Sequence, residues 1–89
     1  MREAWLKCEV SHGMFPGEKT VVIDAVGTRM SFFVHESASF FDSSNNAIWV
    51  NILGHNQHGV VVSLPCETLE GHRVATVRTW QLITFPECT

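Results

Sequence analysis

Two runs of alternating apolar residues, separated by a short polar segment, constrain the fold of this chain more than any other feature. Every second residue is apolar over 48–52 and again over 60–64, and the polar segment 54–59 lies between these runs. Successive side chains of a β-strand point to opposite faces, so this period of two predicts two strands that each bury one face. We therefore expect an antiparallel hairpin over 47–65. Pro65 ends it, because proline cannot donate a hydrogen bond to a sheet.

Shorter runs with the same alternation predict further strands elsewhere in the chain. They cover 4–10, 19–26, 29–35, 73–78 and 82–85. Gly27 and Thr28 form a Gly-X pair that suits a two-residue type II′ turn. The segment 36–46 breaks the alternation and fits either one helical turn or an extended excursion. No window supports a helix of ten or more residues, so an all-β domain of about five to seven short strands is expected.

The loop 11–17 contains two glycines and a proline, together with the apolar residues Met14 and Phe15. Glycine and proline mark this segment as a loop. Because Met14 and Phe15 are apolar, we expect the loop to fold back and cover one end of the core.

Length and composition indicate one globular domain over residues 1–89. A chain of 89 residues can bury roughly two-thirds of its unfolded surface around a single core. The sequence is 45% apolar and 17% charged, which is typical of globular rather than disordered proteins.

Charge and cysteine usage bound the partners and the compartment. The net charge is −3 and the six basic residues are scattered singly, so a nucleic-acid partner is disfavoured. The N-terminus lacks the pattern of a signal peptide, and no apolar run is long enough to span a membrane. Three cysteines cannot all pair within one chain, and reduced thiols in the cytoplasm are expected, with a disulfide between two of them as the alternative.

The C-terminal segment 74–83 resembles the end of an SH3-like small barrel. A strand is followed by Thr79, Trp80 and Gln81, which suit a single 3₁₀ turn, and then by a short last strand. The resemblance implies a small, partly open antiparallel barrel, and an OB-like barrel is the alternative. The chain has no tyrosine, so the proline-rich ligands of SH3 domains are not carried over.

Three large aromatic residues are the candidate binding residues. Trp5, Phe33 and Trp49 each occupy the strand face opposite the predicted core, among polar neighbours. If their strands are adjacent, the three side chains form an exposed stripe of the kind that binds proteins. Alternatively, the early loop, Phe40 and Phe41, or Trp80 cover them as a second small core.

Two other sets of residues are candidates for chemistry. His55 and His58 could share a metal ion, but the segment 54–59 supplies no cysteine or carboxylate, so a solvated hairpin tip is expected. Cys66 and His72 could form a nucleophile and base, but a domain of this size offers little concave surface for a substrate. We therefore expect no catalytic residues, no metal and no cofactor.

The sequence thus favours a non-catalytic module that binds a protein partner or its own copy through Trp5, Phe33 and Trp49. A nucleic-acid-binding barrel is the alternative, because aromatic residues can stack on bases. A metal-binding protein or a small enzyme is a third possibility.

Overall fold

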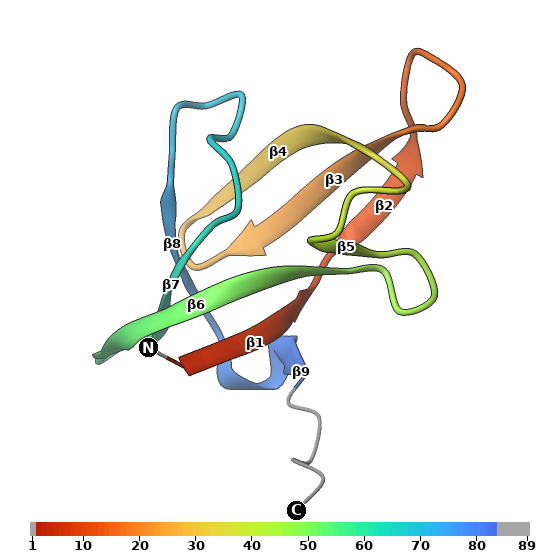
Figure 1. Cartoon of the computed structure of the whole chain (residues 1–89). Coiled ribbons are helices and arrows are strands. Elements are labelled where there is room, and N and C mark those ends of the chain that lie inside the picture. The colour runs from red at the N-terminus through yellow and green to blue at the C-terminus, as the bar shows by residue number, and fades with distance from the viewer. Residues whose placement is uncertain (1, 84–89) are drawn as a thin grey trace, which may run out of the picture.

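The computed structural model describes residues 2–83, and nearly all of their regular structure is β (Figure 1). This confirms the all-β prediction. The one helical element in this range is the 3₁₀ turn η1, so no described helix is long and apolar enough to cross a membrane. The strands are β1 (Arg2–Lys7), β2 (Glu9–His12), β3 (Glu18–Ala25), β4 (Thr28–His35), β5 (Phe41–Asp42), β6 (Ala47–Asn56), β7 (Gly59–Ser63), β8 (Val74–Val77) and β9 (Leu82–Ile83), and η1 is Thr79–Gln81.

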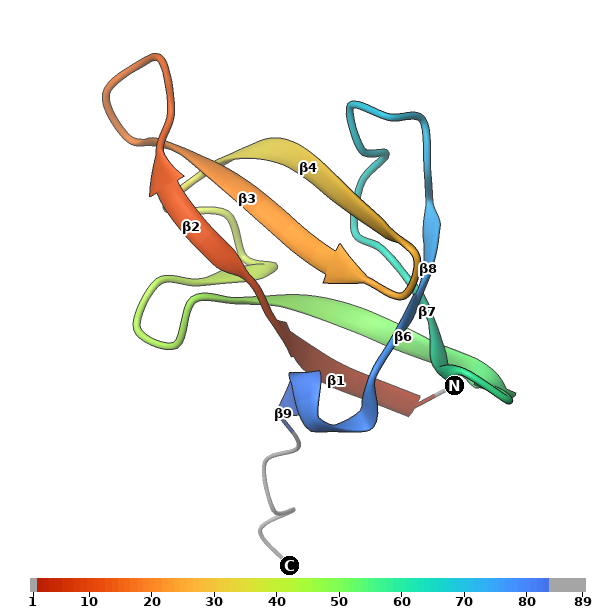
Figure 2. The same cartoon turned by 180° about the vertical axis from the view of Figure 1, so that it is seen from behind.

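The strands form two antiparallel sheets that face each other across the core. The larger sheet has the order β8-β7-β6-β1-β9, with β5 beside β6, and the smaller sheet has the order β2-β3-β4. Figures 1 and 2 show the smaller sheet lying across the larger one. The described strands do not close into a barrel.

One N-terminal ribbon belongs to both sheets. β1 pairs with β6 and β9 in the larger sheet, whereas β2 pairs with β3 in the smaller sheet. The chain changes sheet at Cys8, whose backbone N–H donates to the carbonyl of Asn46 at 2.9 Å. The Cys8 thiol donates to the same oxygen at 3.2 Å. Asn46 therefore fixes the point at which the ribbon leaves β6.

The predicted hairpin is the centre of the larger sheet. Ile48, Val50 and Val62 are fully buried, as the alternation predicts. Strand β6 extends further than predicted and contains a register shift between Ile52 and Gly54. The extra residue is Leu53, and half of its surface is exposed. The bulge therefore interrupts the alternation without disturbing the core.

The 3₁₀ turn predicted at 79–81 is confirmed, and it holds together the open side between the two sheets. The buried Gln81 donates from Nε2 to the Asp24 carbonyl of β3 at 2.9 Å. Its Oε1 accepts from the Arg78 N–H at 2.7 Å. Nearby, the Val26 N–H donates to the Thr76 carbonyl of β8 at 2.8 Å. These bonds tie the β3–β4 hairpin to the C-terminal part of the chain.

The loop between β7 and β8 caps the outer edge of β4 at Ser31. The Leu69 N–H donates to the Ser31 carbonyl at 2.8 Å, and the Glu70 carboxylate accepts from the Ser31 N–H at 2.8 Å. This backbone donor is the main cause of the lowered pKa of Glu70. Bonds of this kind block a further strand from pairing with β4 at Ser31.

The prediction that loop 11–17 covers the core is wrong. The first two residues belong to β2, and the remaining loop projects away from both sheets (Figures 1 and 2). Met14 and Phe15 are 79% and 67% exposed. Glu18 holds the loop in this position, because its carboxylate accepts from the Met14 N–H at 2.7 Å and its carbonyl accepts from the Gly13 N–H at 2.8 Å.

The turn between β3 and β4 lies one residue earlier than predicted. Ala25 pairs with Thr28, so Val26 and Gly27 are the central residues. The positive φ of 81° falls on Gly27, the second central residue. That is the pattern of a type II turn rather than type II′.

Gly59 is the glycine that the fold requires most strictly. A Cβ atom there would lie 2.2 Å from the Val77 carbonyl oxygen, and the residue has φ 156°. We expect Gly59→Ala to lower the free energy of unfolding by roughly 1–3 kcal/mol, because β7 and β8 must separate to accept the methyl group. Urea denaturation measures this loss. Gly54→Ala is the matched control, because nothing lies within 4 Å of its added Cβ; equal losses for the two variants would contradict the prediction.

Replacing Gln81 tests the bonds that hold the open side. Gln81→Leu leaves the Arg78 N–H and the Asp24 carbonyl without their partner, and we expect it to lower the free energy of unfolding by about 1–3 kcal/mol. Gln57→Leu, at the exposed β6–β7 turn, makes the same chemical change where no buried bond is lost. Thermal unfolding of both variants provides the comparison, and an unchanged midpoint for Gln81→Leu would refute the role given to this side chain.

Candidate functional site

The structure brings Trp5 and Trp49 together on the outer face of the larger sheet. The two residues are direct partners in the register of β1 with β6, and Trp5 also pairs with Ile83 of β9. Their neighbours Leu6 and Ile48 point the other way and are fully buried. Alternation therefore places both indoles on the face turned away from the core.

Backbone bonding brings these two indoles close to each other. The Trp49 N–H donates to the Phe40 carbonyl at 2.8 Å, on the side of β6 that faces β5. Trp49 is therefore not hydrogen-bonded to β1, and Trp5 and Trp49 form a non-hydrogen-bonded pair. In such pairs the side chains approach most closely, and aromatic pairs across strands stabilise the sheet.

The paired indoles are part of a row that crosses the sheet. Phe40 lies beside Trp49 through their backbone bond, and Ile83 lies beside Trp5. Trp49, Trp5 and Ile83 are half-buried, whereas Phe40 packs against the core and is not part of this surface. We call Trp49, Trp5 and Ile83 the tryptophan row.

Polar residues border the tryptophan row on the same face. Glu3 pairs with Asn51 on one side of it, and Lys7 lies on the other side, opposite Ala47. An apolar centre with a polar rim is the common arrangement of protein-binding surfaces.

The structure separates Phe33 from the two tryptophans, so the three do not form one stripe. Phe33 belongs to β4 in the smaller sheet, where it pairs with Thr20 and is 42% exposed. Its neighbours Phe32 and Val34 are buried in the core between the sheets. Phe33 therefore faces outward from the opposite side of the molecule. Sequence alternation identified its face correctly but not its sheet.

Most of the segments predicted to cover the three aromatic residues do not do so. The loop with Met14 and Phe15 extends into solvent, and Trp80 is 69% exposed. Phe40 is the one member of the predicted cover that lies beside a tryptophan, because its carbonyl bonds to Trp49. Trp5 and Trp49 therefore remain partly accessible.

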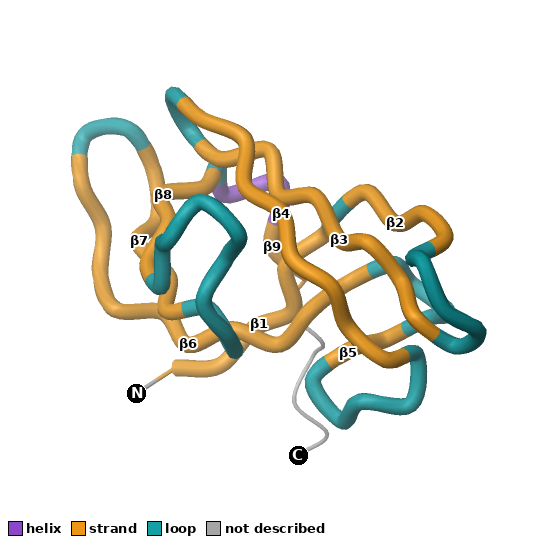
Figure 3. The backbone as a smooth tube through the Cα atoms, turned by 90° about the horizontal axis from the view of Figure 1, so that it is seen from above, coloured by secondary structure: helices purple, strands orange, loops and turns teal. Residues whose placement is uncertain are grey.

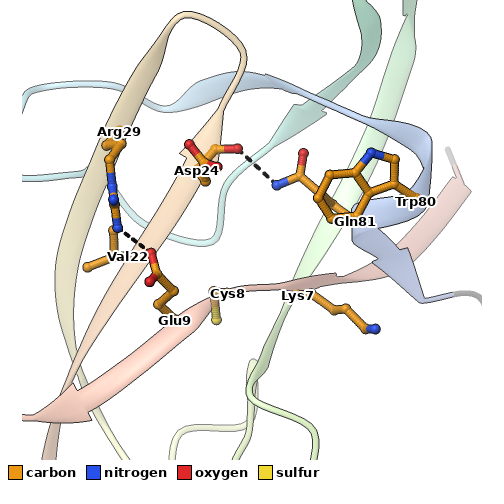
Figure 4. Close-up of a pocket in the computed structure, with 8 residues that line it drawn as sticks. All are labelled: Lys7, Cys8, Glu9, Val22, Asp24, Arg29, Trp80 and Gln81. Carbon is orange, nitrogen blue, oxygen red and sulfur yellow. Dashed lines mark hydrogen bonds and ion pairs between the residues drawn. The ribbon is translucent and has the colours of Figure 1, made fainter.

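Trp80 lines a hollow between η1, the β1–β2 ribbon and β3 (Figure 4). The cavity has a volume of about 340 Å³. Gln81 and Asp24 meet at its back, and an ion pair between Glu9 and Arg29 borders one side (Figure 4). No local sequence pattern predicts this hollow, because its walls come from segments far apart in the chain.

Among residues 2–83, no three metal-ligating side chains come together. His55 lies at the end of β6, and His58 lies in the turn that follows. The Asn56 side-chain oxygen organises this turn by accepting from the N–H groups of His58 and Gly59, at 2.8 and 3.1 Å.

The described thiols are poor nucleophiles. Burial raises the pKa of Cys8 to about 12. Burial also raises the pKa of Cys66, although the charge of Arg73 partly opposes the shift. Both are free thiols, and Cys88 lies outside the described residues. His72 bonds through its backbone to Thr68, whose hydroxyl accepts from the His72 N–H at 3.0 Å.

Comparison of the chain with protein-family models, with curated proteins and with solved structures finds no match.

The raised pKa of Cys8 predicts slow alkylation in the folded protein. A thiol reacts as its thiolate, and the thiolate fraction at mildly alkaline pH falls as the pKa rises from 9.0 to about 12. We expect iodoacetamide to modify Cys8 about a hundredfold or more slowly in the folded protein than in urea. Mass spectrometry of the peptide that contains Cys8 measures both rates, and similar rates in the two conditions would contradict the burial of this thiol.

Proposed function

We propose that this chain is a non-catalytic β domain that binds another protein through the tryptophan row. The observation that carries the proposal is the register pairing of Trp5 with Trp49 on a sheet face that does not contribute to the core. Aromatic residues dominate the anchors of protein interfaces, because each buries a large area while losing little conformational freedom.

The charge arrangement favours a protein partner over a nucleic acid. Phosphate binding needs several unpaired cations on one surface. Three of the six basic residues lie in ion pairs with carboxylates of the same chain: Lys19 with Glu36, Arg29 with Glu9, and Arg73 with Glu67. Within the described residues, Lys7 is the basic residue that borders the tryptophan row, opposite Ala47.

We further propose that the domain is related in architecture to SH3-like barrels and works in the cytoplasm. The order of β8, η1 and β9, with β9 returning to pair with β1, supports the first proposal. The free thiols of Cys8 and Cys66 support the second, because such thiols are typical of a reducing compartment.

Trp49→Ser tests the proposed function. We expect it to weaken partner binding by about 2 kcal/mol or more, the range of a central interface anchor, while the domain stays folded. The immobilised domain is used to capture partners from a cell extract, and each captured protein is then purified and titrated against both forms by calorimetry.

The matched control is Trp80→Ser, which removes an exposed indole that lies on η1 and is not a member of the tryptophan row. A partner lost with Trp49→Ser and retained with Trp80→Ser supports the proposal. Two results would overturn it: equal binding by wild type and Trp49→Ser, or unfolding of Trp49→Ser, which would make Trp49 a core residue.

A further inference from the structure

Strand β2 leaves one edge of the smaller sheet open. The Gly13 N–H donates to the Glu18 carbonyl, so the odd-numbered residues of this ribbon bond to β3. Bonding alternates along an antiparallel strand, so the backbone groups of Val10 and His12 point away from β3. Cys8 follows the same rule, since its N–H points outward to Asn46.

The other long edge of the smaller sheet, β4, is capped at one position. At β4, Leu69 and Glu70 cap the backbone of Ser31. At β2, no described residue donates to the carbonyl of Val10 or accepts from the N–H of Val10 or His12, and the His12 carbonyl has only a 3.4 Å contact from the Thr20 hydroxyl. Figure 3 shows β2 at the margin of the molecule. Unpaired edge groups are a template for an additional strand.

A cavity of about 370 Å³ opens beside this edge. It is lined by Val10 and Phe41, which are apolar, and by His12, Lys19, Glu36 and Asn46. Val10 pairs with Val21, and His12 pairs with Lys19. The side chains of Val10 and His12 therefore lie on the face of the smaller sheet that carries the buried Val21. An added strand would direct its inward side chains toward this cavity.

We propose that two copies of this chain associate through β2, which pairs antiparallel with β2 of the second copy about a two-fold axis at Ser11. In this register Val10 lies opposite His12 of the second copy, and each such pair exchanges both of its N–H···O bonds. Ser11 faces its own symmetry mate, and Glu9 faces Gly13, beside the Glu18 carboxylate that accepts from the Met14 N–H. The contact uses the same patch on both copies and therefore closes as a dimer.

The second copy also fits the cavity in chemistry. In this register its Val10 lies opposite His12 and its His12 lies opposite Val10, so its inward side chains face a lining that contains both the apolar Val10 and Phe41 and the carboxylate of Glu36. That carboxylate is only loosely engaged by Lys19, at 3.8 Å, so it can accept from an imidazole. The proposal uses a different surface from the tryptophan row and does not depend on the proposed function.

Sedimentation equilibrium from micromolar to millimolar protein tests the dimer. We expect wild type to dimerise with rising concentration and His12→Pro to raise the dissociation constant about tenfold or more, because proline removes an outward N–H. The ladder with β3 is preserved, since proline is tolerated where the N–H of an edge strand faces away from the sheet. His12→Ala, which keeps the N–H, is the control and should dimerise more strongly than His12→Pro. Trp49→Ser should dimerise as wild type does, which separates this test from that of the tryptophan row.

Amide hydrogen exchange of the wild-type protein keeps the test independent of how the variants fold. We expect the Val10 and His12 amides to become more protected as concentration rises, while the Ser11 amide, bonded to β3, does not change. A wild type that stays monomeric, or Val10 and His12 amides whose exchange is independent of concentration, would overturn the proposal.

Discussion

The architecture depends on one constraint: a single N-terminal ribbon serves as a strand of two sheets. Up to Lys7 the ribbon is held between β6 and β9, and from Glu9 it is held by β3. The bonds from Cys8 to the Asn46 carbonyl fix the point of change. Because both sheets grow from this ribbon, their apolar faces must converge, and the core forms between them. Where β1 and β3 diverge, a gap opens, and Gln81 occupies it with bonds to Asp24 and Arg78.

The same constraint distributes the surfaces available for binding. In the larger sheet the ribbon is an inner strand, so the outward side chain of Trp5 has a neighbour on each side and becomes part of the tryptophan row. In the smaller sheet the ribbon is an edge strand, so the backbone groups of Val10 and His12 face solvent. One half of the ribbon therefore offers side chains to a partner, and the other half offers backbone.

Much of the fold follows from local patterns in the sequence, and the failures of those patterns have specific causes. The strands around Ile48 and Val62 and the 3₁₀ turn at 79–81 form as predicted, because period-two burial and turn chemistry act over a few residues. The apolar character of Met14 predicts that it packs on the core. In the structure its N–H donates to the nearby Glu18 carboxylate, and its side chain is exposed. In the candidate site, alternation placed Trp5, Trp49 and Phe33 on outward faces, but it carries no information about which strands are neighbours.

By itself, therefore, the sequence determined that the chain is all-β, which residues of each strand face the core, and where the chain turns before β9. Only the tertiary structure decided that Trp49 lies against Trp5 and that Phe33 lies on the other sheet. It also decided that β2 keeps an open edge while β4 is capped from Glu70, a residue 39 positions away. The physical reason is the range of the interactions: side-chain alternation is a property of one strand, whereas sheet order depends on contacts between segments far apart in the chain.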